Sequence, residues 1–164
     1  MRRCVNLGCG DKPIPSTAEE EWTNVDVHSS PGVQVVADLR EGLPYFSDAS
    51  MDHVLLDNVL EHLRFPFNRH LINEIDRVLT IGGTCEIIVP RFPSPGSVQD
   101  ASHVSFYTER SALYWNSRPL PVGTPYSRLA GFTSELIAEK IDRWGNPDEE
   151  EFLRFSLRKA GPLP

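Results

Sequence analysis

Residues 5–10, Val5-Asn6-Leu7-Gly8-Cys9-Gly10, decide how this chain begins to fold. An apolar strand runs directly into two glycines that flank a single residue. Because glycine has no Cβ, such a pair lets the backbone turn sharply and approach a ligand closely. The third glycine of a dinucleotide fingerprint is missing, since Asp11-Lys12-Pro13 follow instead. The stretch alone therefore predicts either a tight structural turn or a binding site for a nucleotide-type ligand.

The length and charge of the chain set the class of protein. With 164 residues it is expected to form one domain, residues 1–164, that is large enough to bury a core without staples. Its net charge of -7 argues against bulk electrostatic capture of nucleic acid or of an anionic membrane. No run approaches the ~18 apolar residues of a membrane span. We therefore expect no nucleic-acid or membrane partner, whereas an oligomer is compatible with the sequence.

The cysteines indicate the compartment. Their number is odd, none are spaced as Cys-x-x-Cys, and two fall in apolar strand-like runs; they are Cys4, Cys9 and Cys85. A disulfide framework or a zinc site is therefore not expected, and a reducing, cytoplasmic setting fits better. Arg2 and Arg3 are not followed by an apolar segment, so no signal peptide is expected.

Hydrophobic periodicity predicts strands that alternate with helical segments. One helix is expected over 67–80, where apolar residues recur on one face and Gly82-Gly83 follow, and a helical turn or two is expected over 16–21. A further short helix is expected to begin near Thr108. The expected strands are 4–7, 24–27, 33–37, 51–56, 84–89, 134–141 and 151–157. This order predicts an α/β fold with a mostly parallel sheet of about seven strands, an antiparallel C-terminal hairpin and helices on both faces.

Four positions fall at or just beyond a predicted strand end; they are Gly8, Asp26, Asp38 and Asp57. In open parallel sheets the carboxyl ends of the strands share one edge, and ligands bind there at the point where the strand order reverses. The four positions are therefore predicted to form one site. The proline-rich and glycine-rich segment 91–131 is predicted to be a substrate lid, because long segments of this kind inside a compact domain are usually functional.

In these motifs and their order the chain resembles the class I S-adenosylmethionine (SAM)-dependent methyltransferases, especially small ones that start almost at the first strand. The resemblance spans nearly the whole chain and rests on Asn6–Gly10, Asn24–Val27, Ala37–Leu39, Met51–Val54 with Asp57–Leu63, and Arg77–Leu79 with Gly82-Gly83. It implies a Rossmann-like methyltransferase fold and an enzyme with SAM as its cofactor. Prolines after Gly10 imply an abbreviated first helix.

The resemblance also implies where SAM binds. Asp26 is expected to accept from the ribose hydroxyls, Asp38 from the adenine amine, and Asp57 or Asn58 to hold the SAM amino group or to face the reacting methyl. The expected cofactor-binding residues are Asn6, Gly8, Cys9, Gly10, Asp26, Val27, Asp38, Leu39, Asp57 and Asn58. Structural interpretations stay open at this point: Asp26 as a helix cap or surface acid, Asp38 as a turn residue, and Asp57 as a helix cap.

Methyl transfer from a sulfonium depends mainly on proximity and orientation, and a base is needed only where the acceptor loses a proton. His103 and Asp57 are the expected catalytic residues, with an exposed loop histidine as the alternative for His103. His62 is expected to pack or cap. Asp100 and His103 resemble metal ligands, but two residues do not make a site, so no metal is expected. Aromatic residues of the lid segment are expected to pack on the sheet; they are Tyr114, Trp115 and Phe132.

The leading hypothesis is transfer of a methyl group to a small-molecule or saccharide-type acceptor. The first alternative is a non-catalytic SAM-binding scaffold or partner subunit, which the small size of the chain suggests. The second is an NAD-type Rossmann domain, which Gly8-Cys9-Gly10 and Asp26 by themselves permit. The motif Asp57–His62 and the closing hairpin count against this second alternative.

Overall fold

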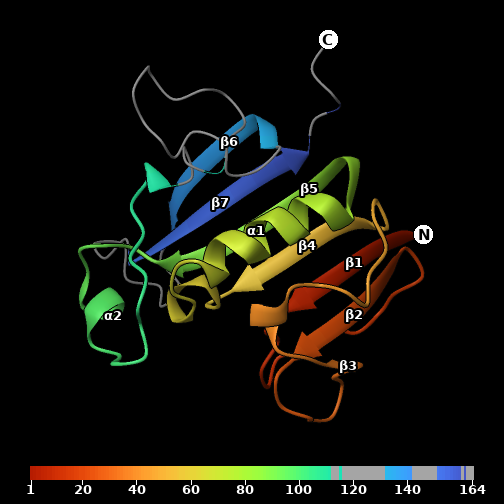
Figure 1. The fold of residues 1–164 in the computed structure, drawn as a ribbon, viewed down its shortest axis with the longest axis horizontal. Coiled ribbons are helices and arrows are strands. Elements are labelled where there is room, and N and C mark those ends of the chain that lie inside the picture. The colour runs from red at the N-terminus through yellow and green to blue at the C-terminus, as the bar shows by residue number, and fades with distance from the viewer. Residues whose placement is uncertain (112–114, 116–131, 142–150, 160, 162–164) are drawn as a thin grey trace.

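One sheet holds all the strands of the computed structural model, in the order β3-β2-β1-β4-β5-β7-β6 (Figure 1). The structure describes residues 1–111, 115, 132–141, 151–159 and 161, with only the backbone of 132–141. The strands are β1 (Arg2–Leu7), β2 (Glu20–Asp26), β3 (Val35–Val36), β4 (Met51–Asp57), β5 (Leu79–Pro90), β6 (Phe132–Ile141) and β7 (Phe152–Lys159). The helices are η1 (Leu39–Glu41), η2 (Leu60–His62), α1 (Phe67–Val78) and α2 (Pro95–Val98).

The strand directions confirm the predicted fold class. Strands β1 to β5 run parallel to one another. Strand β7 lies between β5 and β6 and is antiparallel to both. In Figure 1 the arrows of β1, β2 and β4 therefore point to one edge, and β7 points the other way. Strand β1 lies between β2 and β4, so the strand order reverses beside it.

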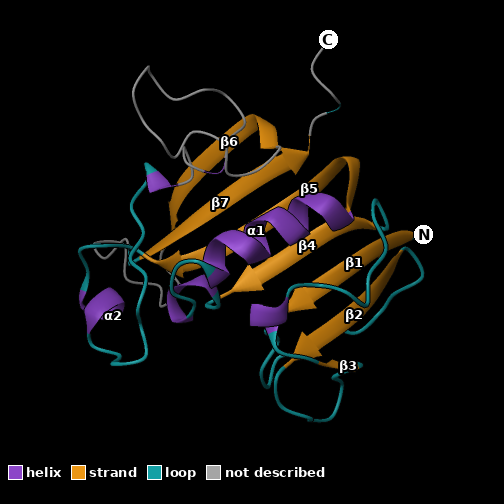
Figure 2. Ribbon diagram, in the orientation of Figure 1, coloured by secondary structure: helices purple, strands orange, loops and turns teal. Residues whose placement is uncertain are grey.

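The core lies between α1 and one face of the sheet (Figure 2). Helix α1 buries its apolar stripe of Leu71, Ile72, Ile75 and Val78 against the strands. The strands meet it with rows of side chains that the register aligns across the sheet. One row is wholly buried and crosses four strands; it comprises Leu7, Leu56, Ile87 and Phe155. Helices on both faces were expected, but in the part of the chain that the structure describes α1 is the only helix longer than four residues. None of the described helices is long and apolar enough to cross a membrane.

The end of α1 differs from the prediction. The helix stops at Val78, two residues before its predicted end at Thr80, and β5 starts at the next residue. The reason is tertiary, because Leu79 is fully buried and pairs with Met51 of β4. Gly82 instead lies in an exposed part of β5 with a φ of 81°, where the register against β4 shifts.

The segment between β1 and β2 contains no helix, although a helical turn was predicted over 16–21. Its backbone is held by a buried pair of amides instead. Asn6 donates to Lys12 O at 3.2 Å, and Asn24 both accepts from Ile14 N and donates to Ile14 O, at 2.8 and 2.9 Å. These side chains satisfy backbone groups of Lys12 and Ile14, so the proline-containing segment is held without a helix.

The described half of the lid segment, residues 91–111, is anchored beside the carboxyl ends of the strands. Val104 N and Ser105 N both donate to Glu61 O of η2, at 2.8 and 3.0 Å. Tyr107 Oη donates to Leu60 O at 3.2 Å. These bonds hold the lid segment against η2. The helix expected near Thr108 falls largely outside the described residues.

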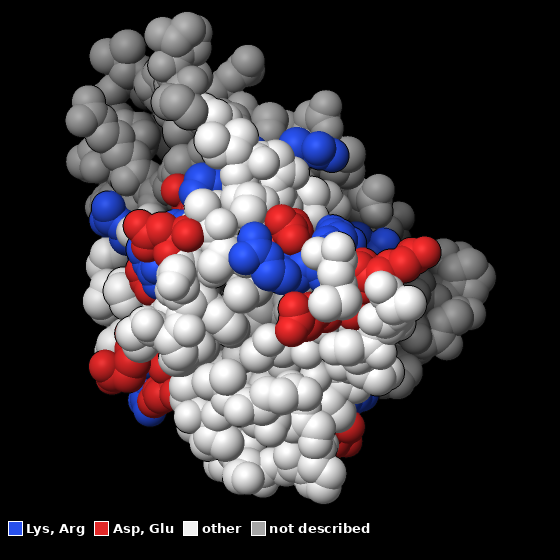
Figure 3. Space-filling view, turned by 90° about the vertical axis from the view of Figure 1, so that its right-hand side faces the viewer, with Lys and Arg blue, Asp and Glu red and all other residues white. Residues whose placement is uncertain are grey.

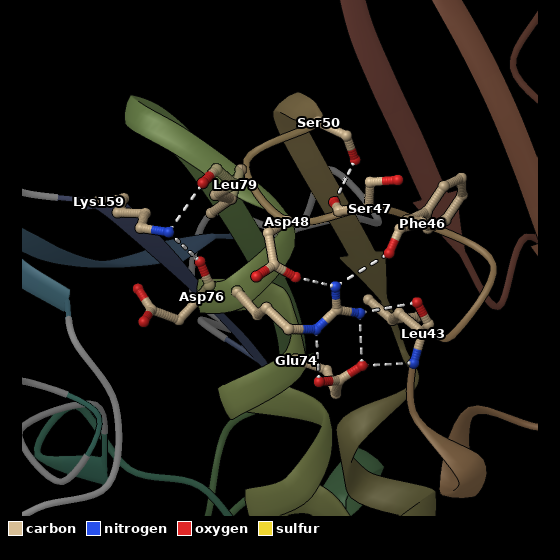
Figure 4. A network of polar contacts seen from close by, with 10 residues as sticks. Leu43, Phe46, Ser47, Asp48, Ser50, Glu74, Asp76, Leu79 and Lys159 are labelled. Atoms are coloured by element: carbon tan, nitrogen blue, oxygen red, sulfur yellow. Dashed lines mark hydrogen bonds and ion pairs between the residues drawn. The ribbon is translucent and has the colours of Figure 1, made fainter.

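A saturated guanidinium group ties α1 to the segment that precedes β4 (Figure 4). Arg77 donates to both carboxylate oxygens of Glu74, to Asp48, and to the carbonyls of Leu43 and Phe46, over 2.7–3.0 Å. Glu74 in turn accepts from Leu43 N at 3.0 Å. The hydrogen bond from Arg77 is the main cause that lowers the pKa of Glu74 to about 2.

Replacing Arg77 with Met should lower the free energy of unfolding at pH 7 by about 2–3 kcal/mol, because it removes charge-assisted hydrogen bonds from a largely buried acid. The pKa of Glu74 is depressed in the folded state, from 4.5 to about 2. Its contribution is therefore complete above pH 4.5 and is lost as the pH falls toward 2. Urea unfolding should show the difference between wild type and Arg77→Met shrinking over that interval. Arg69→Met, an exposed change on the same helix, is the control, and a difference that is constant with pH would contradict the prediction.

Candidate functional site

The glycine turn after β1 is held against the end of β2. Gly8 N and Cys9 N both donate to Val25 O, at 2.8 and 3.0 Å. Gly8 has a φ of 70° and Gly10 a φ of 54°, which glycine adopts without a steric penalty. A Cβ on Gly8 would lie 2.5 Å from a methyl group of Val59, whereas a Cβ on Gly10 would meet nothing within 4 Å. Gly8 is therefore required both for the turn and for the approach of the segment after β4.

Asp26 joins the glycine turn to the end of β2. One carboxylate oxygen accepts from Gly10 N at 2.8 Å and the other accepts from His28 N at 2.9 Å. Asp26 is thus neither a helix cap nor a surface acid, the two structural interpretations that the sequence left open; it holds the loops that follow β1 and β2. A carboxylate offers about four lone-pair sites, so acceptor capacity toward a ligand remains. Asp26 is 9% exposed and lines a cavity.

Two cavities meet at Gly8 and Asn58, which line both. The first, about 340 Å³, is lined by Asn6, Gly8, Cys9, Gly10, Asp11, Lys12, Ile14, Leu55, Asp57 and Asn58. The second, about 350 Å³, is lined by Gly8, Asp26, Val27, Ala37, Asp38, Leu39, Arg40, Asn58, Val59, His62 and Leu63. Every residue predicted to bind the cofactor lines at least one of them. The sheet edge therefore brings these residues together, as the strand-end pattern indicated.

Asp38 is engaged at the start of η1. Its carboxylate accepts from Arg40 N at 2.9 Å and from the Arg40 guanidinium, so that it caps the short helix. The hydrogen bonds from the Arg40 side chain lower the pKa of Asp38. Asp38 is therefore ionised near neutral pH, and both side chains face the second cavity.

The chain turns sharply after β4 at Asn58. This residue has a φ of 57°, a left-handed conformation that asparagine tolerates better than most residues, and its N–H donates to Ile88 O at 2.9 Å. The turn leaves Asp57 facing the first cavity and carries Val59 and His62 into the wall of the second. The structure does not place Asp57 as the cap of a regular helix, because η2 begins at Leu60 with Val59 before it.

A polar cluster joins η2 to the lid segment beside the second cavity; we call it the histidine cluster, formed by Glu61, His62, Asp100, Ser102 and His103. The rings of His62 and His103 make an edge-on contact with centroids 4.9 Å apart. His103 Nδ1 lies 3.2 Å from Ser97 O, and Ser102 Oγ bridges His62 Nδ1 at 3.0 Å and Asp100 Oδ1 at 2.6 Å. His103 is thus partly buried within a network rather than an exposed loop residue.

Three functional candidates escaped the sequence analysis. Lys12 and Arg40 bring positive charge to the first and second cavities, and Glu61 joins the histidine cluster. Lys12 follows the glycine turn closely, so its position offered a signal. The proximity of Glu61 to the lid segment depends on contacts between distant parts of the chain.

Of the aromatic residues predicted to pack on the sheet, Trp115 has a side chain that the structure describes. Trp115 is buried and contacts Tyr107 and Phe155, with ring centroids 5.9 and 5.2 Å apart. It therefore packs the lid segment onto the sheet, as predicted. Tyr114 and the side chain of Phe132 lie outside the described residues.

Comparisons with known proteins point to one family. Residues 6–87 match the methyltransferase domain family. The fold is similar to that of 1,6-didemethyltoxoflavin N1-methyltransferase from Burkholderia thailandensis, solved with 1,6-didemethyltoxoflavin and S-adenosylhomocysteine (17% identity, 97% of this chain, 71% of that chain, TM-score 0.67). It is also similar to a SAM-dependent methyltransferase from Archaeoglobus fulgidus (16% identity, 96% of this chain, 86% of that chain, TM-score 0.64). A third similar structure is a protein from Haloferax volcanii in complex with the Trm112 methyltransferase activator (16% identity, 98% of this chain, 83% of that chain, TM-score 0.63). At 16–17% sequence identity, these structural similarities show that the fold is shared. No curated protein sequence matches the chain.

Gly8→Ala should destabilise the protein more than Gly10→Ala does. Both substitutions place a Cβ at positive φ, at a cost of about 1–2 kcal/mol, but only Gly8→Ala also forces a contact with Val59, which adds about 1–3 kcal/mol. The double variant Gly8→Ala/Val59→Ala should recover the part of the lost stability that comes from the contact between the new Cβ and the Val59 side chain. Urea unfolding of the three variants checks this, and equal losses for the two single variants would contradict it.

Proposed function

We propose that this chain transfers the methyl group of SAM to a small-molecule or saccharide-type acceptor. The chain belongs to the methyltransferase domain family and is a SAM-dependent methyltransferase domain. The observation that carries the proposal is the histidine cluster at the wall of the second cavity. Its hydroxyl, imidazole and carboxylate groups suit a polar, hydroxyl-bearing acceptor of limited size. The three cysteines of the chain are all unpaired and buried, which supports work in a reducing compartment such as the cytoplasm.

The residues around the two cavities fit SAM. Asp26 and Asp38 provide carboxylates for the ribose hydroxyls and the adenine amine, beside Val27 and Leu39. In the first cavity the glycine turn is open to the methionine part, with Lys12 for its carboxylate and Asp57 or Asn58 for its amino group. The absence of a Cβ at Gly8 and Gly10 leaves room for close approach.

The structure gives a physical reason against the NAD-type alternative. A dinucleotide fold holds its pyrophosphate at the N-terminus of the helix that follows the first strand. Residues 8–19 are all described and contain no helix. SAM carries no phosphate, so it does not need that helix.

His103 is proposed as the residue that accepts the acceptor's proton. Ser97 O accepts a hydrogen bond and has no proton to give, so His103 Nδ1 carries the proton of this contact. In the neutral imidazole, Nε2 then holds the lone pair that a base needs. SAM supplies a methyl group that is already activated as part of a sulfonium. The chain contributes orientation of the acceptor and removal of its proton.

The charges on the surface support a small acceptor over a nucleic acid. Figure 3 shows Lys and Arg side chains intermixed with Asp and Glu on the face that it presents. The described residues also form ion pairs between these two classes of side chain; they include Arg2–Glu20, Arg3–Asp52 and Arg77–Asp48. This face therefore does not carry the basic surface that phosphate backbones require, and the net charge of the chain is -7.

SAM and S-adenosylhomocysteine should stabilise the wild type by about 2.7 kcal/mol at ~100 times the dissociation constant, and NAD should not. Asp26→Ala should abolish this gain, because it removes the ribose acceptor. Asp26→Asn serves if the alanine variant unfolds, since the amide oxygen still accepts one backbone N–H. Thermal unfolding with and without ligand is the measurement, and Glu41→Ala, an exposed change outside the cavities, is the control. An unchanged gain in both Asp26 variants would remove Asp26 from the ribose role.

Transfer of labelled methyl from SAM should occur to hydroxylated small molecules or saccharides in a panel that also contains protein and nucleic acid. His103→Ala should lower turnover by about 10²-fold or more and leave the SAM dissociation constant unchanged. Transfer to protein or nucleic acid alone would contradict the proposed acceptor class. SAM binding with no transfer to any acceptor would favour the non-catalytic SAM-binding scaffold.

A further inference from the structure

We propose that the histidine cluster binds a divalent transition-metal ion through Glu61, His62 and His103, with Zn²⁺ as the representative ion. One ligand atom from each of these residues lies within 4.8 Å of the others. The expectation of no metal rested on Asp100 and His103 alone, and the fold adds two more donors to that pair. Two imidazoles and a carboxylate form a ligand set that suits zinc and its neighbours rather than Mg²⁺ or Ca²⁺.

Hydrogen bonds set both imidazoles in the tautomer that a metal requires. His103 Nδ1 donates to Ser97 O, so the Nε2 atom holds the lone pair. At His62 the same result follows from Ser102. The single hydroxyl proton of Ser102 goes to Asp100 Oδ1 at 2.6 Å, so Ser102 Oγ must accept from His62 Nδ1. Each ring therefore presents Nε2, with Nδ1 held by a partner outside the ligand set, as is usual for metal-bound histidines.

The backbone holds the ligands together from two segments of the chain. Glu61 and His62 are consecutive residues of η2, and His103 directly precedes Val104. The bonds from Val104 N and Ser105 N to Glu61 O fix these segments side by side. Glu61 is 2% exposed and His62 is exposed. The site thus combines a buried carboxylate with one exposed imidazole.

The dimensions of the cluster are close to those of a bound ion. Three atoms no more than 4.8 Å apart enclose a point about 2.8 Å from each, against metal–ligand distances of about 2.0–2.2 Å. Closing this gap takes a shift of roughly 0.7 Å for each of the three ligand atoms.

The place of the site suggests what the ion does. His62 also lines the second cavity, so the candidate ion site lies beside the proposed SAM site. An ion there lowers the pKa of a coordinated acceptor hydroxyl and orients its oxygen. If an ion were bound there, His103 would be its ligand rather than the base, and the proton of a coordinated hydroxyl would pass to solvent. This role rests on the proposed function, whereas binding of the ion does not.

Titration of the chelator-treated full chain with Co²⁺ tests the proposal, because Co²⁺ bound by imidazoles absorbs in the visible range and Zn²⁺ should displace it. We expect one ion per chain. His62→Ala and His103→Ala should each weaken binding by about 10²-fold or more, and Ser102→Ala, which frees the His62 ring, by about 10-fold. His70→Ala, an exposed histidine on α1 outside the cluster, should bind as the wild type does.

Equal Co²⁺ affinity in wild type, His62→Ala and His103→Ala would overturn the proposal, and so would the lack of a visible band in the wild type. SAM binding measured on the same samples separates the two proposals. Metal binding without SAM binding supports the metal site and contradicts the proposed function. SAM binding without metal binding overturns only the metal site.

Discussion

The pairing of β1 with β2 on one side and with β4 on the other is the constraint on which the rest of the structure depends. Parallel pairing places the last residues of β1, β2 and β4 at one edge of the sheet; they are Leu7, Asp26 and Asp57. The order of strands reverses at this edge. Fully buried rows such as Leu7–Leu56–Ile87–Phe155 keep the register, because a slip by one residue would turn every side chain to the opposite face. The position of the site follows from the packing of the core.

Side chains replace secondary structure around this edge. The amides of Asn6 and Asn24 satisfy the backbone of the segment after the glycine turn, and Asp26 satisfies two N–H groups that no strand partner reaches. The chain can therefore dispense with a helix between β1 and β2. A site for SAM does not need this helix, because SAM has no phosphate that a helix N-terminus would bind.

The side of the site that we propose for the acceptor is built from segments that meet only in the fold. Asn58 turns the chain out of β4, η2 follows, and the lid segment returns after β5 to bond with Glu61. The histidine cluster arises at this junction, next to the second cavity. The sides proposed for the methyl donor and for the acceptor thus share one wall, formed by the residues that follow β4.

The amino-acid sequence by itself determined the parallel sheet with its closing hairpin, the apolar stripe of α1, and the residues that line the two cavities proposed for the cofactor. Those features follow from local patterns: a period of two or 3.6 residues, glycines after a strand, and acids at strand ends. Only the tertiary structure decided that α1 ends at Val78, that no helix follows Gly10, and that Glu61 and His62 join Asp100 and His103. The physical reason is the same in each case. Buried pairing partners such as Met51 and Asn24, or backbone bonds such as Val104 N to Glu61 O, come from distant parts of the chain and outweigh local preference.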